Sequence, residues 1–205
     1  SASWGAAVGR SAVAPILEAI ERAQQKGVIF VAAAANDGKS NDTREVYPAN
    51  AGLPNVISVA ASQDDDTKPS WSNFGKMNVD LASPGHKILS TLPSNKYGLL
   101  SGTSMATPLV AGLVALMASS QKDDAALKPT VAKALLQATG SQVAIETACN
   151  CRVDADAVLT ALDNQTLTVV PNAITLAPEA DLQFEAFGGQ GPYTYAVDNS
   201  SIAGM

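Results

Sequence analysis

Residues 101–112 read SGTSMATPLVAG, a glycine-containing turn that runs directly into a long apolar stretch. The apolar stretch predicts a helix over residues 104–119, which tolerates Pro108 because this proline falls near the first turn. Ser104 then stands at the helix N-terminus, where unpaired main-chain N–H groups and the positive end of the helix dipole favour a developing oxyanion. Taken alone, the pattern favours a helix-capping serine, and a catalytic nucleophile is the alternative.

Strands and helices alternate on both sides of this stretch. Continuous apolar runs predict strands that are buried on both faces, and apolar residues at helical spacing predict amphipathic helices, the first capped by Ser11 and ended by Gly27. The predicted strands are 28–34, 56–60, 79–81 and 88–92, and the predicted helices are 11–27, 104–119 and 129–139. This order indicates an α/β fold, with a mainly parallel sheet and helices on both faces.

The pattern changes after about Leu162, where polar and apolar residues begin to alternate as in β-strands. Strands are predicted at 167–170, 174–176 and 182–184, and a turn at 188–191 leads into a short strand at 193–195. Three or four strands rarely complete a β-sandwich. We therefore expect two domains, 1–162 and 163–205, the second a partial antiparallel β module.

Composition excludes several classes of partner. The chain has 46% apolar and 16% charged residues, a net charge of −6 and a pI near 4.6. An acidic globular chain argues against nucleic acid or an anionic membrane as partner. No apolar run reaches the roughly 18 residues that span a bilayer, and no signal peptide opens the sequence.

The two cysteines, Cys149 and Cys151, form a C-x-C pair. With His86 as the only histidine, the pair does not indicate a metal site. Three states remain open, in order of preference: pairing with cysteines outside the chain, a local disulfide that closes a very small ring, and free thiols.

Several segments, in this order along the chain, resemble the subtilisin-like serine proteases, or subtilases. They are residues 3–5 (SWG), 30–38 (FVAAAANDG), 47–49 (YPA), 55–61 (NVISVAA), 72–75 (SNFG), 80–85 (DLASPG) and 102–108 (GTSMATP). The resemblance covers residues 1–162 and implies a subtilisin-like fold that is incomplete at its N-terminus. It also reverses the preference at Ser104 from helix cap to nucleophile.

The resemblance implies a role for each matched segment. Ser104 would attack the scissile carbonyl, and its own N–H and the Asn36 amide would stabilise the oxyanion. By sequence alone Asn36 is a turn residue of an Asn-Asp-Gly loop, which is the alternative role. The chain departs from the family at Ala35, where glycine is usual, and at Leu109, where histidine is usual. The extra methyl group of Ala35 either narrows a pocket or tilts the turn that holds Asn36.

Substrate binding would use strand addition, in which an extended peptide pairs with the backbone of Ser3, Trp4 and Gly5. Trp4 would border a side-chain pocket, with a buried core tryptophan as the alternative. The remaining substrate-binding residues expected from the resemblance are Ala33, Ala34, Ala35 and Thr103.

The general base is the missing part. The aspartate and histidine of the family precede the matched segments in chain order. His86 falls between Asn36 and Ser104, where the family has no base, so a solvent-facing loop residue is expected. The aspartate and histidine would then come from sequence upstream of Ser1 or from an N-terminal companion chain. This chain alone should show little catalysis beyond that of an oxyanion hole.

The resemblance leads us to expect an endopeptidase that works through an acyl-enzyme, secreted and bacterial, with an extended polypeptide as substrate. The chemistry requires no cofactor; a structural calcium ion could bind Asp64, Asp65 and Asp66 with Asn41 or Asp42. Two other functions stay open. One is a non-catalytic peptide-binding module, and the other is an adhesion or scaffold protein, because GGQGPYTY at 188–195 resembles the start of bacterial immunoglobulin-like domains.

Overall fold

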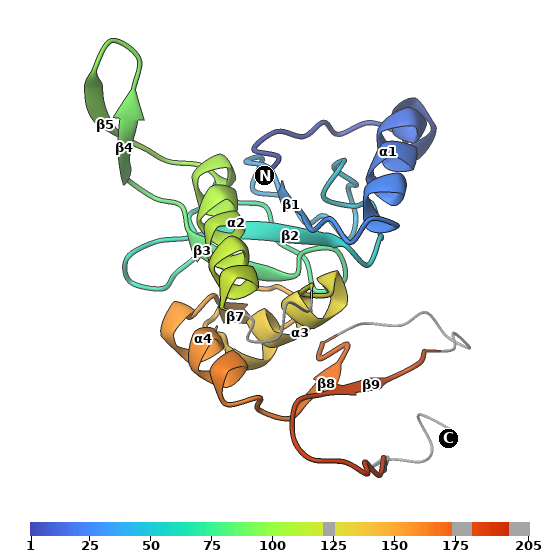
Figure 1. The fold of residues 1–205 in the computed structure, drawn as a ribbon. Helices are drawn as coiled ribbons and strands as arrows, with labels where there is room; N and C mark the ends of the chain where they lie inside the picture. Colours follow the sequence, from blue (N-terminus) through green and yellow to red (C-terminus); the bar gives the residue numbers. More distant parts are fainter. Residues whose placement is uncertain (121–125, 174–181, 197–205) are drawn as a thin grey trace.

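A five-stranded sheet forms the centre of the computed structural model, which describes residues 1–120, 126–173 and 182–196. The strand order is β1-β2-β3-β7-β6, and Figure 1 labels the first four of these strands. The first four strands run parallel and β6 pairs with β7 in the antiparallel sense. The strands are β1 (Phe30–Ala33), β2 (Val56–Ser62), β3 (Leu81–Pro84), β6 (Ser141–Gln142) and β7 (Cys151–Arg152).

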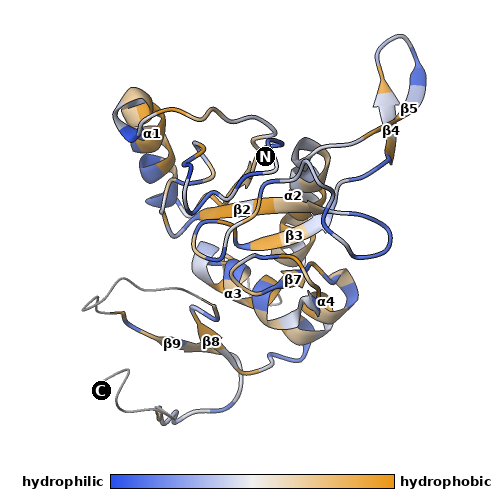
Figure 2. Ribbon diagram, turned by 180° about the vertical axis from the view of Figure 1, so that it is seen from behind, coloured by the Kyte–Doolittle hydropathy of each residue, from blue (hydrophilic) through white to orange (hydrophobic). Residues whose placement is uncertain are grey.

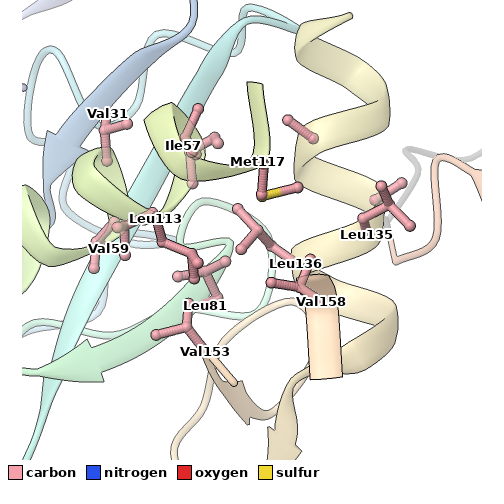
Figure 3. Close-up of a cluster of buried hydrophobic side chains, with 14 of the residues drawn as sticks. Val31, Ile57, Val59, Leu81, Leu113, Met117, Leu135, Leu136, Val153 and Val158 are labelled. Carbon is pink, nitrogen blue, oxygen red and sulfur yellow. The ribbon is translucent and has the colours of Figure 1, made fainter. Parts of the chain in front are cut away.

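Helices cover both faces of the sheet because side chains alternate along each strand. Val31, Ile57 and Leu81 pack in one cluster with the helices α2 (Thr103–Ser119), α3 (Pro129–Thr139) and α4 (Ala155–Asp163) (Figure 3). Ala32 and Val56 point to the other face and pack against α1 (Ala14–Gln24). Figure 2 shows β2 and β3 as hydrophobic over much of their length. The predicted α/β class is confirmed.

Most predicted elements lie where the sequence placed them. Helix α3 has the predicted bounds, α2 begins one residue early, and β1 and β2 overlap the predicted runs. The cap assigned to Ser11 is wrong: a 3-10 turn (Arg10–Val13) precedes α1, and Val13 takes the cap position without a side-chain hydrogen bond. Gly27 has φ +72 just after α1, a conformation that glycine adopts freely. Helix α4 and the strands β6, β7 and β5 (Lys96–Leu100) are not among the predicted elements.

The strand predicted at 88–92 exists, but it is not part of the main sheet. β4 (Ile88–Leu92) pairs with β5 (Lys96–Leu100) in an antiparallel hairpin that projects from the body (Figure 1). Ser94 and Asn95, between the strands, both have positive φ, as a type I′ turn requires.

The C-terminal part forms a second antiparallel pair, β8 (Thr168–Val170) with β9 (Glu185–Phe187). The strand predicted at 182–184 is wrong, because β9 begins at Glu185. Residues 193–195 are not in a strand, and the strand predicted at 174–176 lies outside the described residues. Val170 is buried in the main hydrophobic cluster, with Phe187 packed against it. No helix within the described ranges is long and apolar enough to cross a membrane.

Cys149 and Cys151 form a disulfide with each other. The preferred expectation of partners outside the chain is therefore wrong. Cys151 lies in β7 and is fully buried, so no second chain could reach its sulfur.

Candidate active site

Ser104 lies in the first turn of α2, at the carboxyl-terminal edge of the parallel strands, where ligands of open α/β sheets bind. Gly102 takes the N-cap position without any side-chain cap, so the alternative in which Ser104 caps the helix is wrong. The approach of α2 to the sheet is close. Gly102 N donates to Gly85 O, directly after β3, and a Cβ on Gly85 would stand 2.7 Å from the Ala61 Cβ.

Ser104 and Ser3 bind one another through two hydrogen bonds. Ser104 Oγ donates to Ser3 O at 3.0 Å, and Ser3 Oγ donates to Ser104 O at 2.8 Å. Ser104 O is free to accept because Pro108, four residues on, has no N–H to offer it. The proline therefore leaves an acceptor in the helix that the Ser3 segment uses, and this holds Ser3 beside the Ser104 hydroxyl.

Asn36 reaches the same helix end from the loop after β1. Its Oδ1 accepts two hydrogen bonds, from Thr103 N at 2.9 Å and from Thr103 Oγ1 at 3.0 Å. With its oxygen fixed in this way, the Asn36 Nδ2 lies toward Gly102. A Cβ on Gly102 would stand 3.5 Å from Asn36 Nδ2 and 3.6 Å from Ser104 N. Both nitrogens thus lie close to one point beside Gly102, and Met105 Sδ lies 3.6 Å from the same point.

Ala33, Ala34 and Ala35 differ in what they present at the end of β1. Ala34 is fully buried, and its methyl group packs with Ala60 and Ala82 on the face of the sheet that points away from α2. Ala33 is almost fully buried, and Thr103 beside the site is fully buried as well. Ala35 is half-buried and has φ +88, which an alanine seldom adopts. The methyl group of Ala35 is therefore accommodated by a strained backbone.

The Ser3–Gly5 segment lies at the carboxyl-terminal edge of the parallel strands, where Ser3 hydrogen-bonds to Ser104. Ala2 pairs with Ala32 of β1 and Ala6 pairs with Tyr47, so both ends of the segment are fixed. Trp4 is 53% exposed, and the alternative of a buried core tryptophan is wrong. A Cβ on Gly5 would stand 3.0 Å from Val46 and 3.2 Å from Tyr47 O, so a larger residue would need these neighbours to shift by a few tenths of an ångström.

His86 lies in the turn after β3 and is half-buried. Among the described residues, the hydrogen-bond partner of Ser104 Oγ is the main-chain oxygen of Ser3 and not a side-chain base. Hydrogen bonds from Thr67 hold the pKa of Asp65 below its usual value, and His86 adds a smaller electrostatic effect. The expected loop role of His86 fits this position.

The residues suggested for calcium do not fit a calcium ion. Asn41 is fully buried, and its Oδ1 accepts from Asn73. Asp66 binds Arg152, and Asp42 accepts from Met77 and Asn78. Within the described part of the chain, no group of three or more His, Cys, Asp or Glu residues could hold a metal ion. We therefore derive no role for calcium.

Asn41 and Asn73 are the residues that sequence reasoning missed as parts of the site. Both are buried, and both hydrogen-bond within or next to the loop that carries Asn36. The SNFG segment contained Asn73 as a match to the family, but its contact lies more than thirty residues away in sequence.

Known serine proteases are similar to this chain in sequence. Thermitase of Thermoactinomyces vulgaris is 41% identical over 131 residues, which cover 64% of this chain and 44% of thermitase. The major intracellular serine protease of Bacillus subtilis is 40% identical over 115 residues, 56% of this chain and 36% of that protein. This chain thus spans less than half the length of these relatives.

Solved structures of serine proteases have a similar fold. A protease from Pseudoalteromonas arctica superposes with a TM-score of 0.68 at 29% identity, covering 78% of this chain and 50% of that one. A cold-adapted subtilisin-like serine proteinase gives 0.59 at 33% identity, covering 69% and 47%. The model of the subtilase family matches residues 1–192. The chain therefore belongs to the subtilase family of serine proteases.

Proposed function

We propose that this chain supplies the nucleophile and the oxyanion hole of an endopeptidase that hydrolyses peptide bonds through an acyl-enzyme. One observation carries the proposal: Asn36 Nδ2 and Ser104 N both lie within 3.6 Å of one point beside Gly102. Two N–H donors aimed at one point are what a tetrahedral intermediate needs.

The proposed reaction starts with an extended peptide paired along Ser3, Trp4 and Gly5. Ser104 Oγ leaves its bond to Ser3 O, transfers its proton to a general base and attacks the scissile carbonyl. The carbonyl oxygen becomes an oxyanion and accepts from Ser104 N and Asn36 Nδ2. Collapse expels the amine, which takes the proton from the base, and water then hydrolyses the ester by the same steps. No cofactor enters this sequence.

We place one wall of the substrate pocket at Ala33 and Ala35, next to Thr103. Ala34 stands behind this wall, because its methyl group packs on the other face of the sheet. The exposed Trp4 side chain borders the groove on the side of the Ser3–Gly5 segment.

We further propose that the aspartate and histidine come from sequence before Ser1 or from a companion chain. The exposed apolar residues support a missing cover. Leu109 and Leu116 on α2 are 45% and 48% exposed, and Leu89 and Leu99 on the hairpin are 67% and 59% exposed. A helix that is apolar all round is normally buried.

Fluorophosphonate labelling tests the nucleophile, because this reagent modifies only activated serines. The probe is applied to this chain alone and to a preparation that also contains the segment with the aspartate and histidine. We expect strong labelling in the second preparation and its loss in Ser104→Ala. Ser101→Ala is the matched control, since this neighbouring hydroxyl accepts from Lys87 N and has no assigned catalytic role. An unlabelled complete preparation would favour the peptide-binding module instead.

Asn36 can be tested by substitution. In subtilisin, itself a subtilase, loss of one oxyanion-hole donor lowers kcat by about 10²–10³-fold, and we adopt that figure for Asn36→Ala. A drop in kcat with KM unchanged would fit a donor that acts in the transition state. An unchanged kcat would leave Asn36 as a turn residue.

Secretion and the C-terminal segment complete the proposal. The Cys149–Cys151 disulfide supports an oxidising compartment outside the cytosol. The antiparallel β8–β9 pair supports a separate β module over 163–205, whereas the burial of Val170 and the family match to residue 192 tie this segment to the peptidase domain. Expression of residues 1–162 alone distinguishes the two, since a separate module can be removed without loss of stability.

A further inference from the structure

Two buried asparagine side chains bind the main chain on both sides of Asn36. Asn73 is 1% exposed, and its Oδ1 accepts from Asp37 N at 2.9 Å and from Lys39 N at 3.1 Å. Its Nδ2 donates to Asn41 Oδ1 at 3.0 Å. Every polar atom of the Asn73 side chain thus has a partner, which is how a buried amide becomes directional rather than costly.

The contacts continue on the other side of Asn36. Asn41, fully buried, donates through Nδ2 to Ala34 O at 3.1 Å, and Asn73 N donates to Ala35 O at 3.0 Å. The bonds therefore reach residues 34, 35, 37 and 39, on both sides of Asn36. Ala35 has φ +88, a conformation that persists only where the surrounding structure imposes it.

We propose that Asn73 is a positioning residue for the oxyanion donor Asn36, an inference that rests on the proposed function. Thr103 fixes the Asn36 side-chain oxygen, while Asn73 fixes the main chain from which that side chain extends. A donor held in place before reaction costs no reorganisation when the oxyanion develops. The loop would otherwise be a surface turn free to move away from Ser104.

Asn73→Ala removes the acceptor from Asp37 N and Lys39 N, and it leaves Asn41 Oδ1 without its donor. In the complete, active preparation we expect kcat to fall about 10- to 100-fold with KM within about twofold, the size expected when a reacting group is misplaced by about 1 Å. Asn73→Asp keeps the acceptor but places an oxygen against Asn41 Oδ1. Its kcat should lie between the values of the unsubstituted protein and of Asn73→Ala.

Asn55→Ala is the matched control for a merely structural effect. Asn55 is also fully buried, and its Nδ2 donates to Ile20 O and Val28 O. It directly precedes β2, whereas Asn36 follows the parallel strand β1, so the two lie at opposite edges of the sheet. Both variants should lose thermal stability, and only Asn73→Ala should lose kcat. An equal loss of kcat in Asn55→Ala would overturn the proposal.

A double-mutant cycle tests whether Asn73 acts through Asn36. In an Asn36→Ala background, adding Asn73→Ala should change kcat by less than about twofold, because the donor that it positions is already gone. The same 10- to 100-fold loss in both backgrounds would show that Asn73 acts elsewhere.

A measurement on this chain alone needs no activity. Asn73→Ala should shift the NMR signals of the Asn36 side-chain amide and speed hydrogen exchange at Asp37 N and Lys39 N, while Asn55→Ala should leave both unchanged. Unchanged signals in Asn73→Ala would overturn the positioning role. If the signals move but Ser104→Ala keeps full peptidase activity, the proposed function fails instead.

Discussion

Strands β2 and β4 are both short and rich in apolar residues, yet they have opposite environments. All seven residues of β2 are buried, whereas Leu89 in β4 is 67% exposed. Strand β2 has a parallel neighbour on each side and helices over both faces, while β4 has only β5. Apolar character therefore predicts a strand, and the neighbours of the strand decide whether it is buried.

The molecule divides accordingly into a closed half and an open half. The closed half is the five-stranded sheet with the helices packed on it. The open half is the β4–β5 hairpin together with the outer face of α2, which carries the exposed residues Leu109 and Leu116. A lone two-stranded hairpin is marginally stable at best, so the open half should add little to the stability of this chain until something covers it.

Matched leucine substitutions test this division with the largest effect. Leu81→Ala in β3 removes a fully buried side chain and should lower the free energy of unfolding by about 2–5 kcal/mol. Leu99→Ala in β5 removes a side chain that is 59% exposed and should change it by less than about 0.5 kcal/mol. Urea unfolding measures both.

The same two leucine substitutions also test the proposal that another segment packs on the hairpin. In a preparation with the companion segment, Leu99→Ala should become more destabilising than in this chain alone. A large effect of Leu99→Ala in the isolated chain would break the division, because it would show that the hairpin contributes to the folded core.

An ion pair in the closed half gives the next largest effect. Asp80 Oδ1 lies 3.1 Å from Lys133 Nζ, with both side chains about one-fifth exposed, and Asp80 Oδ2 accepts from Ser58 N. Lys133→Met leaves this carboxylate without its cation and should cost about 1.5–2 kcal/mol in urea unfolding. Lys96→Met on the exposed hairpin is the matched control and should be neutral; equal losses would contradict the division.

Sequence predicted the closed half better than the open half or the site loop. Helix α3 and strand β2 follow from local pattern, and Ser104 and Asn36 follow from the family motifs. The exposure of Ile88–Leu92 could not be predicted, since it depends on neighbours that no local pattern encodes. Asn73 was missed for the same reason, because its partners Asp37 and Asn41 lie more than thirty residues away. The Cys149–Cys151 pairing was ranked second because spacing alone does not show burial.

A helix cap in the closed half gives a smaller effect that depends on pH. Asp154 caps α4, and the hydrogen bonds from Ala157 N and the Ser141 hydroxyl lower the pKa of its carboxyl group. Asp154→Ala should cost about 1 kcal/mol at pH 7. Because the folded pKa is the lower one, this stabilisation is present above about pH 4, the ordinary value, and is lost as the pH falls through the folded pKa.

Urea unfolding of both proteins at a series of pH values checks the sign. The difference between Asp154→Ala and the unsubstituted chain should shrink toward low pH. The exposed Asp64→Ala serves as control and should show little difference at any pH. A difference that grows in acid would contradict the cap assignment.

The smallest effect has the opposite sign and concerns the loop beside the site. Ala35 has φ +88, a strain of about 1–2 kcal/mol for a residue with a Cβ. Glycine relieves it but loses about 0.5–1 kcal/mol of chain entropy, so Ala35→Gly should raise the free energy of unfolding by about 0.5 kcal/mol. Ser94→Gly, at φ +65 in the hairpin turn, removes similar strain in the open half. It should leave global unfolding unchanged, because the hairpin opens by itself. If Ala35→Gly destabilises the chain, the buried asparagines do not determine the conformation of this loop. The loop that carries Asn36 would then not belong to the closed half.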